Sequence, residues 1–148
     1  MTLHVFNPEH DIALAYDNKY FTAPHAGRQL RNDLDYLPVL WAEEGDYVLV
    51  ENVCSAQQHA LRLQRYGKQV NFVDKNGVGR LSEQIDKVLP WGWDSSIKFQ
   101  LGQMGVNLSV LPDEEMLANV RRLSNRQFSS AVLKELQEKF IHPILLGK

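Results

Sequence analysis

The sequence is poor in the features that disulfide-bonded, metal-cluster and membrane proteins require. It holds a single cysteine in 148 residues, which excludes an intrachain disulfide and a thiolate metal cluster. No apolar run approaches the roughly 20 residues that a helix needs to cross a bilayer, and the N-terminus lacks the pattern of a signal peptide. The net charge is −2, and the Lys and Arg residues are scattered. These absences predict a cytoplasmic protein that binds neither nucleic acid nor membranes.

What remains is the composition of an ordinary globular protein. Hydrophobic residues make up 44% of the chain and charged residues 23%. A chain of 148 residues can bury a sizeable core, and one domain is the default expectation at that length.

Short apolar segments alternate with amphipathic ones along the chain. This alternation predicts an α/β fold, in which helices flank a parallel sheet of about four strands. The strands are expected near residues 3–6, 47–51, 69–73 and 106–110. The predicted helices begin near Glu9 and Pro24, at Ser55 with a capping box that includes Gln58, near Leu81, at Asp94 or Ser95, at Pro112, and at Ser124 with a capping box that includes Gln127. Pro38, Gly67, Pro90 and Gly105 are expected to end or bend four of them.

Two predicted helices follow one another near Ser124 without a strand between them. This break predicts a first domain over residues 1–123. Residues 124–148 would then be the start of a following domain or a C-terminal helical tail.

The densest group of reactive polar side chains is Asn7-Pro8-Glu9-His10-Asp11, directly after the first predicted strand. These residues favour a polar substrate or partner site, or a general base. A metal site is less favoured, because consecutive helical residues point about 100° apart and further ligands at suitable spacing are missing. The alternative is a plain helix start, in which Asn7 caps the helix and the carboxylates lie in its positive first turn.

The loops after the other predicted strands carry further polar side chains. Because parallel strands all end at one edge of the sheet, these loops should converge with the first one. We therefore expect the substrate-binding residues to include Asn7, Glu9, His10, Asp11, Asn52 and Asp74, with no metal. Glu51 lies in the same loops, and the surplus of carboxylates favours an amine- or amide-bearing ligand over a nucleotide. Cys54 is expected to be a small buried residue rather than a nucleophile served by His59.

Two stretches carry a resemblance to known proteins. The sequence Phe6-Asn7-Pro8-Glu9-His10-Asp11-Ile12-Ala13-Leu14-Ala15 resembles the opening of a family of uncharacterised bacterial proteins. The stretch Leu123-Ser124-Asn125-Arg126-Gln127 resembles the junction at which ATP-grasp enzymes pass from their N-terminal domain into the ATP-binding lobes. That N-terminal, pre-ATP-grasp domain is a small Rossmann-like parallel sheet, so the resemblance implies such a fold here.

The resemblance also implies a function. These residues would form the N-terminal substrate-side domain of an ATP-grasp-type ligase, not catalytic alone. ATP-grasp lobes in the same polypeptide, or a homodimer, would be the partners. Arg126 stands where many ATP-grasp enzymes place a lysine that contacts nucleotide phosphate, although arginine changes the geometry. No cofactor is expected in this chain, whereas ATP and Mg²⁺ belong to a full-length protein. The alternatives are a stand-alone Rossmann-like binding or regulatory module, and a small hydrolase that uses Cys54 or His10.

Overall fold

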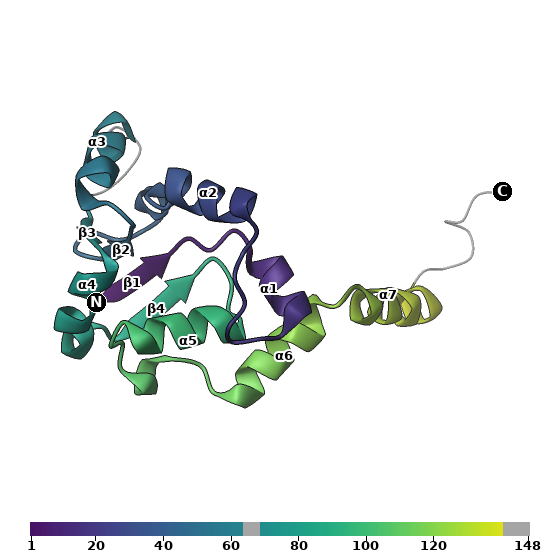
Figure 1. The fold of residues 1–148 in the computed structure, drawn as a ribbon. Helices are drawn as coiled ribbons and strands as arrows, with labels where there is room; N and C mark the ends of the chain where they lie inside the picture. Colours follow the sequence, from purple (N-terminus) through teal and green to yellow (C-terminus); the bar gives the residue numbers. More distant parts are fainter. Residues whose placement is uncertain (64–68, 141–148) are drawn as a thin grey trace.

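The structure is a computed structural model that describes residues 1–63 and 69–140. Figure 1 shows a twisted sheet with helices on both faces and a final helix that leads away from it. In chain order the elements are β1 (Thr2–Val5), α1 (His10–Tyr16), α2 (His25–Leu34), η1 (Leu37–Leu40), β2 (Tyr47–Leu49), α3 (Val53–Leu63), β3 (Asn71–Val73), α4 (Lys75–Val78), η2 (Gly79–Gln84), β4 (Lys87–Pro90), α5 (Ser95–Gln103), η3 (Leu108–Val110), α6 (Glu114–Ser124) and α7 (Arg126–Phe140), where η marks a 3₁₀ helix.

The sheet has four parallel strands in the order β3-β2-β1-β4. Leu3 of β1 is in register with Tyr47 on one side and with Val88 on the other. The predicted α/β class with a small parallel sheet is therefore confirmed. The chain moves outward from β1 through β2 to β3 and then returns to place β4 on the other side of β1. That reversal creates a topological switch point between β1 and β4, where open α/β sheets bind ligands.

The position of the fourth strand was predicted wrongly. Residues 106–110 form no strand, and the fourth strand is β4, in a region predicted to be helical up to Pro90. The apolar residues Val106, Leu108 and Val110 alternate with polar ones and so imitate a strand, in which all three would lie on one face. Instead Val106 is buried and Leu108 is 72% exposed, because the chain enters the 3₁₀ turn η3, where the Asn107 side chain accepts a hydrogen bond from the Ser109 amide.

Pro90 can close β4 because this strand lies at the edge of the sheet. An edge strand has one side without a neighbour, so a missing N–H on that side removes no ladder hydrogen bond. The predicted helix from Leu81 is replaced by the 3₁₀ turn η2 and by β4 itself.

Most helices start close to the predicted residues, but the residues that cap them differ in two cases. Asp94 caps α5 as predicted, and its Oδ1 accepts hydrogen bonds from the amides of Ser96 and Ile97 at 2.9 Å. The two predicted serine capping boxes are wrong. Asn52 caps α3 by accepting from the Ser55 amide, and Asn125 caps α7 by accepting from the Gln127 amide. Gly67, the predicted end of α3, lies outside the described residues.

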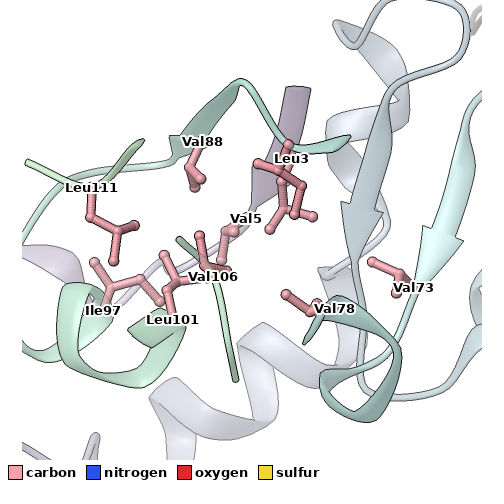
Figure 2. Close-up of a cluster of buried hydrophobic side chains, with 10 residues drawn as sticks. Leu3, Val5, Val73, Val78, Val88, Ile97, Leu101, Val106 and Leu111 are labelled. Carbon is pink, nitrogen blue, oxygen red and sulfur yellow. The ribbon is translucent and has the colours of Figure 1, made fainter. Parts of the chain in front are cut away.

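Two apolar clusters cover the two faces of the sheet. The larger one joins β1, β3 and β4 to α4 and α5 (Figure 2), and its members include Leu3, Val5, Val88, Ile97 and Leu101. The smaller one joins Val48 and Val50 to Ala56 of α3 on the opposite face. Successive side chains of a strand point to opposite faces, which is why β2 and β3 each serve both clusters.

A buried hydrogen bond between side chains connects the first strand to the turn before the second. His4 Nε2 donates to Asp46 Oδ2 at 3.0 Å, and Asp46 Oδ1 accepts from the Thr2 amide at 2.9 Å. Burial alone would raise the pKa of Asp46. The hydrogen bonds from His4, Thr2 and Glu43 together outweigh it and hold the pKa below its ordinary value.

We predict that Asp46 stabilises the fold at neutral pH and ceases to do so in acid. A carboxyl with a lower pKa in the folded state stabilises the fold above its unfolded pKa, and this contribution is lost as the pH falls through the folded pKa. Urea unfolding should show Asp46→Asn to be less stable by about 1–3 kcal/mol at neutral pH, because the amide Nδ2 accepts no hydrogen bond. This difference should shrink toward acid pH.

The matched control for Asp46→Asn is Asp33→Asn, at an exposed position of α2. It should leave the unfolding free energy almost unchanged at every pH. A loss in Asp46→Asn that stays constant from neutral to acid pH would contradict the assignment.

Candidate functional site

The loops that follow β1 and β4 are bonded to each other at the switch point. Asn7, almost fully buried, donates from Nδ2 to the Gly92 carbonyl oxygen at 2.8 Å. Its Oδ1 accepts from the Gly92 amide at 3.3 Å. Asn7 therefore uses both ends of its amide to join two loops that are 85 residues apart.

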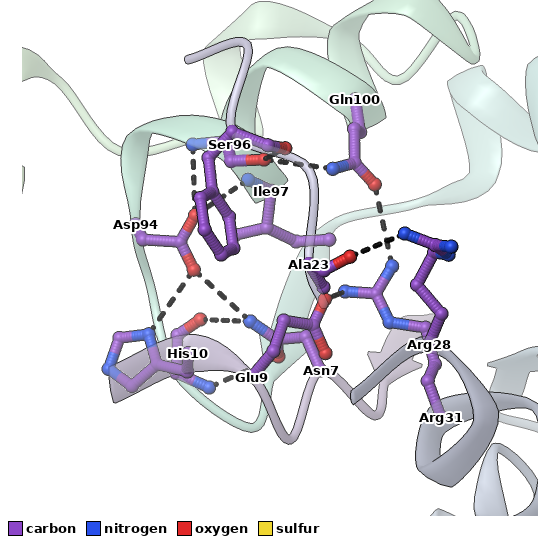
Figure 3. A network of polar contacts seen from close by, with 12 residues as sticks. Asn7, Glu9, His10, Ala23, Arg28, Arg31, Asp94, Ser96, Ile97 and Gln100 are labelled. Carbon is purple, nitrogen blue, oxygen red and sulfur yellow. Dashed lines mark hydrogen bonds and ion pairs between the residues drawn. The ribbon is translucent and has the colours of Figure 1, made fainter. Parts of the chain in front are cut away.

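The carboxylate of Asp94 extends this connection to the helix behind it (Figure 3). One oxygen caps α5, and the other accepts from Asn7 Nδ2 at 3.4 Å and from His10 Nδ1 at 3.3 Å. Asp94 is 3% exposed, and such a buried carboxylate is costly unless donors surround it. Four donors from three segments meet it here.

His10 is held in one orientation by this carboxylate. An ionised carboxylate only accepts hydrogen bonds, so Nδ1 carries the proton and Nε2 is the basic nitrogen. The ring also packs against Gly92, where an added Cβ would lie 2.2 Å from His10 Cδ2. This arrangement suits a positioned general base, although His10 does not line the polar cleft beside it.

A polar cleft of about 330 Å³ lies beside the switch point, between α2, α5 and the segment around Thr22. Its charged and amide-bearing walls include Glu9, Arg28, Arg31, Glu51, Asp94 and Gln100. Glu9 and Glu51 follow the carboxyl ends of β1 and β2, and Asp94 follows that of β4. The cleft is thus at the edge of the sheet where ligands are expected.

Glu9 and Arg31 form an ion pair in the wall of the cleft (Figure 3). Arg31 Nη1 also donates to Gln100 Oε1 at 3.4 Å, which connects α2 to α5. Two polar atoms of the pair, Glu9 Oε2 and Arg31 Nε, are buried and have no hydrogen-bond partner among residues 1–63 and 69–140. Buried polar atoms are normally satisfied, and a third unsatisfied one, His4 Nδ1, lies away from the cleft beside Asp46.

The backbone at Glu51 is fixed by a second buried acid. Asp35 Oδ2 accepts from the Glu51 amide at 2.7 Å. Burial raises the pKa of Asp35 above its ordinary value, against the lowering effect of this hydrogen bond. Perturbed carboxyls gather at functional sites more often than elsewhere, and this one holds the loop that brings Glu51 to the cleft.

The structure brings together only part of the predicted site. Asn7 and His10 meet at Asp94, and Glu9 lies in the cleft wall paired with Arg31. Asp11 is exposed on α1 and is not in the cleft wall. Asn52 and Asp74 cap α3 and α4 through their side chains.

Two further predicted positions lie elsewhere. Arg126 is exposed at the first residue of α7. The expectation that Cys54 is buried is wrong, because its side chain is exposed in the first turn of α3. The ring of His59 stacks on Tyr36 instead of serving that thiol, with 4.9 Å between ring centroids.

Sequence reasoning did not single out Arg28, Arg31 and Gln100 as site residues. The two arginines are three residues apart in α2 and so share one face of the helix, which was the available signal. Gln100 gave no signal, because an amide on a helix is compatible with an ordinary surface. Asp94 was recognised as a cap, but the misplaced fourth strand hid its position beside the first loop.

A second hollow, larger and more apolar, has a volume of about 780 Å³. It is lined mainly by α5, the start of α6 and the segment around Tyr20, and not by the loops after β1 and β2. None of the three buried, unsatisfied polar atoms found in the described residues belongs to its walls.

Within the described residues, no group of three or more His, Cys, Asp or Glu side chains is placed to hold a metal ion. No helix in the same part of the chain has the length and apolarity that crossing a membrane requires. Comparison with protein-family models, curated proteins and solved structures found no match.

We predict that Gly92 is required for the packing of His10. Gly92→Ala should destabilise the protein by about 1–3 kcal/mol, because the new methyl group overlaps a ring that Asp94 holds in place. It should also shift the His10 ring resonances in NMR spectra. Gly102→Ala is the matched control, since its Cβ would meet only Leu108 Cδ2, at an ordinary 3.7 Å.

In Gly102→Ala the stability should be unchanged or higher, because alanine is the better helix former. If Gly92→Ala is as stable as Gly102→Ala and the His10 resonances do not move, the close packing is absent.

Proposed function

We propose that this chain is a Rossmann-like domain that binds a small polar molecule at the carboxyl edge of its sheet. We propose further that it is the N-terminal, substrate-side domain of an ATP-grasp-type ligase and does not catalyse the reaction alone. The observation that carries the proposal is the cleft itself, whose charged walls come from the loops after three parallel strands.

The architecture supports a binding role because the walls of the cleft are rigidly held. Asn7 and Asp94 connect the loops after β1 and β4, and the pair of Arg31 with Glu9 connects α2 to the first loop. A site whose side chains are fixed before the ligand arrives loses less entropy when it binds.

The ligase part of the proposal is supported by the resemblance at Leu123–Gln127 and by the position of α7. This helix leads away from the sheet (Figure 1), and Arg126 is exposed at its start. A nucleotide-binding lobe that follows α6 would therefore meet Arg126 outside the cleft, so the substrate and the nucleotide would approach from different elements.

We predict that the 148-residue chain neither hydrolyses ATP nor binds Mg-ATP tightly. Phosphate binding in nucleotide enzymes uses a glycine-rich loop at a helix N-terminus together with acidic Mg²⁺ ligands, and this sequence contains no such loop. Isothermal titration calorimetry should give a Kd for Mg-ATP in the millimolar range or weaker. A micromolar Kd would contradict the prediction.

The coding sequence after Lys148 separates the ligase domain from the alternative, a stand-alone binding or regulatory module. A continuation with a glycine-rich loop and paired acidic residues supports the ligase. A stop codon directly after Lys148 refutes the ligase part and leaves the binding module.

A further inference from the structure

We propose that the cleft binds a small zwitterion, an amino acid or short peptide that carries a free ammonium and a free carboxylate. Arg28 receives the carboxylate, and the side of the cleft formed by Glu9 and Glu51 receives the ammonium. This inference rests on the binding role proposed above and adds the chemical class of the ligand.

Arg28 is the cation of the cleft that remains available. Its Nη1 donates to the Ala23 carbonyl oxygen at 2.6 Å, and none of the described carboxylates forms an ion pair with it. A guanidinium has five N–H donors in a planar fork that matches a carboxylate. Arg31, by contrast, is neutralised by Glu9. Arg28 is therefore anchored by one bond and has donors left for a ligand.

The opposite charge is available on Glu51, because the carboxylate of Glu9 is paired with Arg31. Glu9 is about nine-tenths buried, and its Oε2 lacks a partner among the described residues. That second oxygen is covered by the protein, so Glu9 stays paired with Arg31 and adds only its charge to this side of the cleft. Glu51 is exposed at the cleft and has no ion-pair partner in the described parts of the chain, while Asp35 fixes its backbone.

The balance of charges separates a zwitterion from a phosphate compound. Glu9, Glu51 and Asp94 line the cleft against Arg28 and Arg31, so the wall carries one more negative charge than positive. A nucleotide or sugar phosphate would bring two or more negative charges into that field and be repelled. A neutral zwitterion can place its carboxylate at Arg28 and its ammonium at the acidic side of the cleft.

The size and polarity of the cleft point to a small ligand. A volume of about 330 Å³ is near the lower end of the range for ligand pockets. Most ligand pockets are lined mainly by apolar side chains. Here the named walls are mainly charged groups and amides, so little apolar surface is offered. This fits an amino acid or dipeptide better than an aromatic cofactor.

The experiment is a titration of the full chain, observed in ¹H–¹⁵N NMR spectra. The probes are the proteinogenic amino acids one by one, and glycylglycine. The reporters are the side-chain amide groups of Asn32 and Gln100, both in the cleft wall. At least one probe should shift these resonances with a millimolar or lower Kd. Its N-acetyl and its carboxamide derivatives should each bind at least about tenfold more weakly, since each lacks one charge.

Three variants test the assigned residues. Arg28→Gln and Glu51→Gln should each weaken the best probe at least about tenfold, and Arg28→Lys should recover part of the loss. Arg80→Gln, exposed on η2 outside the cleft wall, is the control and should bind as the unaltered chain does. The dispersion of the same spectra reports that each variant is folded.

The outcomes separate this inference from the proposed function. If uncharged or phosphate-bearing compounds, screened in parallel, shift Asn32 and Gln100 while no zwitterion does, the zwitterion is wrong and the cleft remains a binding site. If the derivatives bind as well as the parent probe, or Arg28→Gln binds normally, the assignment of the two charges is wrong. If no compound of any class shifts the reporters, both proposals fail.

Discussion

The carboxylate of Asp94 is the group on which the site depends. It caps α5, orients His10 and accepts from Asn7, and so fixes the loops after β1 and β4 relative to each other. Without this group the buried Asn7 and the first turn of α5 would each lose a partner, and the cost of an unsatisfied buried donor is about 1–3 kcal/mol. The parallel sheet brings the loops to one edge, and the hydrogen bonds of Asp94 fix their positions there.

The charges around the cleft follow from the same constraint. Because the first loop is held down, Glu9 is buried against α2, where Arg31 neutralises it. One carboxylate oxygen is still unsatisfied, and the neighbouring Arg28 is not used in an ion pair with any described residue. A buried charge pair that is only partly satisfied contributes little to stability, which is understandable if the arrangement serves binding instead.

The sequence predicted the fold class and three of the four strands, because β1, β2 and β3 are apolar segments with clear breaks around them. It misplaced the fourth strand because the apolar residues Val106, Leu108 and Val110 alternate with polar ones as in a half-buried strand. The residues of β4, in contrast, continue the helical spacing of apolar residues that begins at Leu81 and stops at Pro90. That error hid the contact between Asn7 and Gly92, which depends on β4 lying beside β1. The sequence could not predict the cleft walls from α2 and α5 either. Single residues such as Arg28 and Gln100 form a site only when helices far apart in sequence pack together.

The most direct test of this account compares two aspartates that both cap helices. Asp94→Asn keeps an oxygen for the α5 amides, since asparagine is a good cap, but removes the acceptor for Asn7 and His10. Asp113→Asn makes the same change at α6, where the Met116 amide is the only donor to the side chain within residues 1–63 and 69–140. By urea unfolding, Asp94→Asn should lose about 1–3 kcal/mol, and Asp113→Asn should lose no more than a few tenths. Equal losses would show that Asp94 is an ordinary helix cap and would contradict its role in joining the loops of the site.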